Sequence, residues 1–218
     1  MGYWTELKGS FKLDRKLSEP EHIYLEAFNK TRHFKRNVEK LGFPKDYFGQ
    51  EGEFYIYYPS DIVKKLSKCI VDENDPLYKY YTFPRDVDQG ILSGILNTYI
   101  ERENWAEHGI IDWNMPAGSC PSLYCPWTPS KDGMEIIPDG SDKPYEYTKW
   151  LFFICRNFLE PKKHILNGIV KWQGEEPDDF GQIEIINNEI RIYQGVKDYQ
   201  IMSQEQIESK FGVTQVGS

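Results

Sequence analysis

Long apolar runs are missing from this 218-residue chain. No stretch approaches the roughly 20 consecutive apolar residues that a membrane-spanning helix needs. The first residues, MGYWTELKG, also lack the basic and apolar regions of a secretory signal peptide. We therefore expect a cytoplasmic protein, in the host cytoplasm if a phage encodes it, that does not bind membranes.

Catalytic motifs are lacking as well. The sequence has no G-x-S-x-G nucleophile motif, no P-loop and no G-x-G-x-x-G dinucleotide fingerprint. A zinc site would need closely spaced ligand pairs, whereas Cys120 and Cys125 stand far along the chain from Cys69 and Cys155. We therefore expect buried thiols, no catalytic residues, no metal ligands and no cofactor, and we favour binding over enzymatic catalysis.

Positive charge is scarce, because 26 Lys and Arg against 34 Asp and Glu give a net charge of -8. That balance argues against general nucleic-acid binding, which requires a basic surface. The charge is unevenly distributed, since residues 1–45 contain ten basic and six acidic residues. An acidic chain with one basic segment suggests a charged face for a particular partner.

The start of the chain predicts one strand and one helix. Apolar and polar residues alternate over 3–13, which is typical of a half-buried strand. Ser18 and Glu21 match a capping box, and an apolar stripe at helical spacing follows them, so we predict a helix over 18–41.

Strand and helix patterns return after a middle region with no clear period. Further strands are predicted over 120–128, 134–138 and 165–175, and a second helix between Asp142 and Pro161. Near the C-terminus, Asn187-Asn188 predicts the turn of a hairpin. Its register would pair Ile185 with Ile190, Ile183 with Ile192, and Glu184 with Arg191.

These elements predict an α+β fold. Their order matches a ferredoxin-like (split βαβ) antiparallel sheet with two helices on one face, an extra C-terminal hairpin and a helical insertion. The core domain would comprise 1–45 and 114–195, with an inserted, mostly helical lobe over 46–113. The remaining residues, 196–218, would form a tail with a short helix.

Basic residues form a row on the first predicted helix. Arg32, Arg36 and Lys40 follow one another at four-residue spacing, with His33 beside them. Such a row could bind a phosphate group or an acidic protein surface. The alternative is an ordinary solvated helix face.

The outer face of the predicted sheet is a second candidate binding surface. Trp4, Tyr124, Lys171 and Gln173 would lie on it. An open sheet face of this kind suits a protein or nucleotide partner better than RNA, because the aromatic pair of RNA-recognition domains is missing.

Four carboxylates gather in the segment WQGEEPDDFG. Glu175, Glu176, Asp178 and Asp179 could bind Mg²⁺ or act as acid and base, which would make the protein a metal-dependent hydrolase. The alternative is a solvated acidic turn between two strands.

The segment CPSLYCPWT predicts an edge strand over 120–128, because Pro121 and Pro126 remove backbone donors. Residues five apart on a strand point to opposite faces, so Cys120 and Cys125 would not share a metal ion. Such an edge could also pair between subunits, which would give a structural homo-oligomer.

Three segments carry a resemblance to a known family: GYWTELKGSFKLD, SLYCPW, and the ending NGIVKWQGEEPDDFGQIEI. They resemble small proteins of bacteria, phages and prophages that share a GYW-type start and an NG-x-V-x-WQGE-x-x-x-DFG-x-I ending. The resemblance covers about 1–40 and 110–193, and this chain has Tyr124 and Pro126 where the family has Trp and Gln. The family has no assigned function to transfer.

The resemblance implies a phage-type accessory protein. Small phage proteins often act by binding, and we therefore expect a non-enzymatic, counter-defence factor. It would inhibit a host or defence-system protein, or sequester a small nucleotide signal. The metal-dependent hydrolase and the homo-oligomer remain the alternatives.

Overall fold

The fold is described by a computed structural model that covers residues 3–40, 49–56, 106–195 and 200–201. The chain forms two compact units, the first made of residues 1–18 and 125–218 and the second of residues 19–124. Most of the predicted insertion and the predicted short helix in the tail lie outside the described residues. Within the described part, no helix is long and apolar enough to cross a membrane.

The first unit is built on a seven-stranded sheet in the order β4-β5-β1-β6-β7-β8-β9. Every pair of neighbouring strands is antiparallel. The protein is therefore α+β, as predicted. The strands are β1 (Thr5–Leu13), β4 (Trp127–Pro129), β5 (Glu135–Pro138), β6 (Leu166–Gly174), β7 (Phe180–Ile186), β8 (Glu189–Gln194) and β9 (Gln200–Ile201).

The β7-β8 hairpin confirms the predicted turn and register. Asn187 and Asn188 have φ angles of 52° and 68°, the left-handed values that a tight two-residue turn requires. The paired residues are Ile183 with Ile192, Glu184 with Arg191, and Ile185 with Ile190. All four isoleucines are buried, and each buried side chain stabilises the fold by about 1.5–3 kcal/mol.

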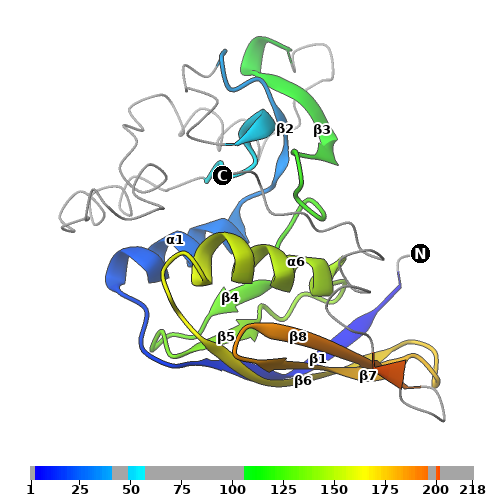
Figure 1. The fold of residues 1–218 in the computed structure, drawn as a ribbon. Coiled ribbons are helices and arrows are strands. Elements are labelled where there is room, and N and C mark those ends of the chain that lie inside the picture. The colour runs from blue at the N-terminus through cyan, green and yellow to red at the C-terminus, as the bar shows by residue number, and fades with distance from the viewer. Residues whose placement is uncertain (1–2, 41–48, 57–105, 196–199, 202–218) are drawn as a thin grey trace. The chain divides into compact units, whose positions relative to one another are not determined.

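Helix α6 (Tyr147–Ile154) lies across one face of this sheet and continues into the π-helical turn η4 (Cys155–Leu159) (Figure 1). The Trp127 indole N–H donates to the Tyr147 carbonyl over 2.7 Å. The ring centroids of Tyr147 and Trp172 are 6.2 Å apart. The buried face of the sheet and the apolar face of α6 thus form one core.

One glycine makes room for a tryptophan side chain in that core. A Cβ atom at Gly181 would lie 2.3 Å from the Trp172 ring and 2.3 Å from the Tyr193 carbonyl oxygen. Gly181 pairs with Trp172 across β6 and β7. The glycine of the DFG segment is therefore required by packing.

The second unit contains α1 (Glu19–Lys30) and a two-stranded antiparallel ribbon of β2 (Phe34–Arg36) and β3 (Ile110–Pro116). Two single-turn 3-10 helices accompany them, η1 (Gln50–Gly52) and η3 (Ala106–His108). The ribbon was not predicted.

The predicted helix over 18–41 is wrong beyond Lys30. The Thr31 hydroxyl donates to the Ala27 carbonyl over 2.8 Å, and the His33 Nε2 lies 2.9 Å from the Phe28 carbonyl oxygen. These side chains bond the carbonyls that a further helical turn would use, so the helix ends there. The predicted basic row therefore does not exist as a helix face.

The predicted strand over 120–128 is also too long, because only Trp127–Pro129 is a strand. Pro121 and Pro126 lack backbone donors. The Cys120 N–H donates to the Ala117 carbonyl over 2.8 Å, which forms a turn in place of a strand. The short β4 does lie at one edge of the sheet.

The compact units differ from the predicted domains. Helix α1 and residues 114–124 belong to the second unit, whereas the prediction grouped them with the core. Residues 200–201 of the predicted tail add β9 to the sheet beside β8.

Candidate functional site

Two of the predicted binding residues, Arg32 and Arg36, take part in a stack of rings and guanidinium groups in the second unit. The Arg36 guanidinium lies 3.9 Å from the centroid of Phe34 and 3.9 Å from that of Tyr55. The ring centroids of Phe34 and Trp113 are 4.5 Å apart. We call this the arginine–aromatic stack; in order it comprises Tyr55, Arg36, Phe34, Trp113, Arg32 and Tyr124.

The outer part of the stack is held by Arg32. Its guanidinium lies 4.6 Å from the Trp113 ring and 5.3 Å from the Tyr124 ring, within cation–π range. Its N–H groups donate to the Trp113 carbonyl and the Tyr124 hydroxyl, both over 3.2 Å, and to the Asn114 side-chain oxygen over 3.5 Å. The Arg32 side chain is therefore oriented by neutral acceptors.

The inner part of the stack is buried. Arg36 is only 3% exposed, and its Nη2 donates to the Arg32 carbonyl over 2.7 Å. Burial lowers the pKa of Arg36 to about 10, so the group stays protonated at neutral pH. Among the residues that the structure describes, no carboxylate forms an ion pair with Arg32 or Arg36. The stack therefore carries two positive charges that rings stabilise in place of counter-ions.

His33 has a structural place beside the stack. Burial, with a further contribution from the nearby Arg36 charge, lowers the pKa of His33 to about 3. The imidazole is therefore neutral at physiological pH and bonds the Phe28 carbonyl. It cannot supply positive charge to a ligand.

Lys40 lies apart from the two arginines, in the turn after β2. Its backbone N–H donates to the Asn37 side-chain oxygen over 3.0 Å, and its ammonium donates to the Ala106 carbonyl. The structure thus brings Arg32 and Arg36 together in the stack, and Lys40 makes its bonds with η3 and its own turn.

The strand that carries Trp113 also bears exposed apolar side chains. Ile111 is 54% exposed, Met115 is 47% exposed and the Tyr124 ring is 50% exposed. Ile111, Trp113 and Met115 all belong to β3, whose pairing with β2 is irregular between Asp112 and Pro116. We call the set formed by these three residues with Arg32 and Tyr124 the β3 face.

The β3 face was only partly predictable. Arg32 and Tyr124 were named from the sequence, and Ile111, Trp113 and Met115 were not. The one available signal was the run of large apolar residues in IIDWNMP.

A second polar group in the same unit surrounds Glu53. Its Oε1 accepts from the Ser119 backbone N–H over 2.8 Å and also from the Ser119 hydroxyl. Burial raises the pKa of the Glu53 carboxyl. Gly49 and Gly118 adopt left-handed φ angles here, and a Cβ on either would press against the carboxylate. The Glu53 carboxylate thus ties η1 to the loop after β3.

The predicted acidic loop is bound to the N-terminal segment. The Asp179 carboxylate accepts from the Tyr3 hydroxyl over 2.7 Å and from the Trp172 indole over 3.3 Å. The Glu175 carboxylate accepts from the Trp4 backbone N–H over 2.7 Å. The GYW start and the WQGE–DFG ending therefore contact each other, and the hydrogen bonds account for both motifs structurally.

The other members of the acidic loop, Glu176 and Asp178, are exposed. In the described part of the chain, no three His, Cys, Asp or Glu side chains are placed to hold a metal ion. Gln173 is fixed by the same loop, since its side-chain N–H groups donate to the carbonyls of Gly174 and Glu176, both over 3.1 Å. Lys171 is exposed on the opposite side of β6 from buried Trp172.

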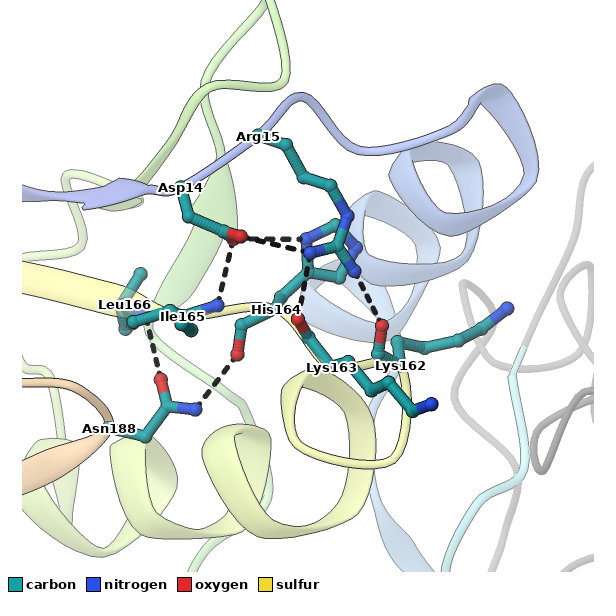
Figure 2. Close-up of polar contacts among 8 residues, drawn as sticks. All are labelled: Asp14, Arg15, Lys162, Lys163, His164, Ile165, Leu166 and Asn188. Atoms are coloured by element: carbon teal, nitrogen blue, oxygen red, sulfur yellow. Dashed lines mark hydrogen bonds and ion pairs between the residues drawn. The ribbon is translucent and has the colours of Figure 1, made fainter.

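A polar junction closes the other end of the sheet (Figure 2). The Asp14 carboxylate accepts from the Ile165 N–H over 2.8 Å and from Arg15 over 2.9 Å, and His164 Nδ1 lies 3.8 Å away. The Ile165 hydrogen bond is the main cause that lowers the pKa of Asp14. Arg15 also donates to the carbonyls of Lys162 and Lys163, over 2.6 and 2.7 Å. This arrangement joins the end of β1 to the start of β6.

Two of the described thiols, those of Cys125 and Cys155, are unsuited to nucleophilic chemistry. Cys120, Cys125 and Cys155 are buried, as predicted for structural cysteines. Burial raises the pKa of Cys125 well above its usual range and that of Cys155 to about 12. Neither would be a thiolate at neutral pH. Cys120 belongs to the second unit and Cys125 to the first.

Comparison of the chain with known proteins identifies no related protein. No protein-family model, curated protein or solved structure matches the chain at a significant level.

Proposed function

We propose that this protein is a non-enzymatic binding protein that uses the β3 face to dock on another protein. The observation that carries the proposal is the contact of the Arg32 guanidinium with the rings of Trp113 and the half-exposed Tyr124. Ile111 and Met115, each about half exposed, belong to the same strand as Trp113. We further propose that it is a phage-type accessory or counter-defence factor, acting on a host protein in the host cytoplasm.

The composition of the β3 face supports a protein partner. Trp, Tyr, Met and Arg are the residue types enriched in protein interfaces, and Trp, Tyr and Arg dominate binding hot spots. Exposed apolar side chains gathered on one strand are unusual on a surface without a partner.

The state of Arg32 specifies the partner further. Its side chain is already fixed by two rings and three neutral acceptors, so binding would lose little of its conformational entropy. Because its charge lacks a carboxylate partner among the described residues, a carboxylate of the partner would complement it. We therefore propose an apolar partner surface that presents an Asp or Glu side chain.

The experiment is capture from a bacterial lysate followed by native mass spectrometry, with matched variants. Tyr124→Ala and Met115→Glu alter the β3 face, whereas Tyr145→Ala and Met134→Glu alter exposed residues of the same type in the first unit. We expect one captured protein whose affinity falls about 10- to 30-fold in the first two variants only. Equal capture by all four variants, or a bare protein, would contradict the proposal.

A small nucleotide is the second candidate ligand, because a half-exposed ring lies next to a cation that needs an anion. A base could stack on Tyr124 while a phosphate bonds Arg32. The same spectra distinguish the two candidates, since a nucleotide adds only a small mass. Loss of that mass in Tyr124→Ala would favour nucleotide sequestration over protein inhibition.

We also propose that the fold is of the split βαβ, ferredoxin-like type. The strand order β4-β5-β1-β6, with antiparallel neighbours, supports this assignment, since such a sheet places the first strand between the third and the fourth. An experimental structure tests it by showing whether α1 packs beside α6 on the same face of the sheet.

A further inference from the structure

The hydrogen bonds of Arg32 fix the chemical roles of its two neighbours, Asn114 and Tyr124. A guanidinium has five N–H donors and no acceptor. The Tyr124 hydroxyl oxygen, at 3.2 Å, and the Asn114 side-chain oxygen, at 3.5 Å, therefore accept from it. The Arg32 Nε–H donates to the Trp113 carbonyl over 3.2 Å. These bonds use three of the five donors and leave two for a ligand.

Both neighbours then offer donors to their surroundings. The Tyr124 hydroxyl proton points away from Arg32, because a guanidinium cannot accept it. The Asn114 amide keeps its N–H groups, since its oxygen is the atom that faces Arg32. In the part of the chain that the structure describes, no acceptor bonds the Tyr124 hydroxyl proton or the Asn114 amide N–H groups. Arg32, Asn114 and Tyr124 thus form a connected set of unused donors.

These donors can be reached from outside the protein. The Asn114 side chain is exposed, the Tyr124 side chain is 50% exposed and Arg32 is partly exposed. The hydrogen bonds of Arg32 to Tyr124 and Asn114 lie at the surface, whereas its bond to the Trp113 carbonyl is partly buried. Trp113 therefore anchors the guanidinium from within, and the other two residues flank its accessible side.

The acidic residues near this set have partners of their own. β3 contains one acid, Asp112, whose carboxylate accepts from the Asn114 backbone N–H over 2.9 Å and so holds Asn114 in place. The register places Asp112 opposite Lys35, which pairs with Glu51 over 3.4 Å. No described carboxylate forms an ion pair with Arg32, and all its hydrogen bonds go to neutral oxygens.

We propose that Arg32, Asn114 and Tyr124 form an oxyanion cradle, which binds a carboxylate or phosphate group of the ligand. Arg32 supplies the charge and two N–H donors, and the Tyr124 hydroxyl and the Asn114 amide donate to further oxygens of the same group. Asn114 and the Tyr124 hydroxyl are then specificity-determining groups. This inference rests on the proposed function, because Arg32 and Tyr124 belong to the β3 face.

The test is an NMR titration of the full chain with inorganic phosphate and, separately, with acetate, each at constant ionic strength against sodium chloride. The Asn114 side-chain amide and the Arg32 Nε–H are the reporters. We expect both signals to shift with a dissociation constant of about 1–10 mM for at least one anion. Tighter binding of acetate assigns the cradle to a protein carboxylate, and tighter binding of phosphate assigns it to a nucleotide or another phosphate ester.

Matched variants separate the cradle from the ring contacts. Tyr124→Phe removes the hydroxyl but keeps the ring, and Asn114→Ala removes the amide, so each should weaken anion binding about five-fold. Asn114→Asp gives Arg32 a carboxylate of its own and should weaken binding more than about ten-fold. Tyr145→Phe, which alters an exposed tyrosine of the first unit, should bind as the unaltered protein does.

Two results would overturn the cradle. One is the absence of saturable shifts with either anion up to about 50 mM. The other is unchanged affinity in both Tyr124→Phe and Asn114→Ala. Failure of protein docking is recognised separately. A captured protein that needs the Tyr124 ring and Met115, but neither the hydroxyl nor Asn114, leaves docking without the cradle, whereas anion binding without a captured protein leaves the cradle alone.

Discussion

The ionisable groups of the two units lie in different environments. In the first unit, the Asp14 and Asp179 carboxylates each accept hydrogen bonds from side-chain or backbone donors. In the second unit, the Arg36 guanidinium lies between aromatic rings and His33 is held neutral. Hydrogen bonds lower the pKa of Asp14, favouring its charged form, whereas burial lowers the pKa of Arg36 and raises that of Glu53, favouring their neutral forms.

This difference supports placing the proposed binding surface in the second unit. A unit whose polar groups are matched by donors is built for stability. Groups that are kept in unfavourable environments are instead concentrated at functional sites. The comparison therefore directs attention to the second unit.

The largest expected effect is a pH dependence of stability that comes from His33 in the second unit. The unfolded chain protonates His33 near pH 6.5, but the folded protein does so only near pH 3. Between these values the unfolded state binds more protons, so stability falls as the pH falls. We expect a loss on the order of 3 kcal/mol by about pH 4 from this group.

The variant His33→Gln isolates that contribution. Urea unfolding of both proteins at pH 7 and pH 4 should show a smaller acid loss in the variant. Glu53 has the opposite effect on stability. Its carboxyl pKa is raised in the folded protein, so the native state binds the proton before the unfolded state does as the pH falls, and stability rises. Asp14 has a lowered pKa, so its contribution is lost only below about pH 4. Equal acid losses in both proteins would contradict the assignment of His33.

A smaller but substantial effect is expected from packing in the first unit. Gly181→Ala would place a Cβ atom against Trp172 and the Tyr193 carbonyl, so we expect a loss of about 2–3 kcal/mol. Gln182→Ala, the next residue along β7, points to the other face and is the control. A change in Gly181→Ala no larger than in the control would mean that the core can shift to accommodate a methyl group.

Regions governed by local patterns were predictable from the sequence. The β7-β8 hairpin follows from alternating isoleucines and a turn pair that tolerates positive φ, and both signals lie within a few residues. The end of α1 was missed because the side chains of Thr31 and His33 compete for helix carbonyls, which leaves no trace in apolar spacing. The prolines of the predicted strand 120–128 were recognised, but their effect on its length was underestimated.

The candidate site was harder to predict because its members are far apart in the chain. Arg32 meets Trp113 and Tyr124 only after β2 pairs with β3, and a single sequence contains no signal for that pairing. The acidic loop shows the same limit. Four neighbouring carboxylates suggested a metal or a solvated turn, whereas Asp179 in fact bonds the distant Tyr3.

The smallest effect concerns the junction of Figure 2, where one side chain joins two segments. The Asn188 side chain accepts from the Leu166 N–H over 2.6 Å and donates to the His164 carbonyl over 2.8 Å. Asn188→Gly keeps the left-handed turn but removes both bonds, so we expect a loss of about 1–2 kcal/mol. Asn187→Gly is the control, because it alters the same turn without touching those bonds. If the two variants unfold at the same urea concentration, the turn conformation and not the junction stabilises this end of the sheet; a difference confirms that the first unit depends on matched polar groups.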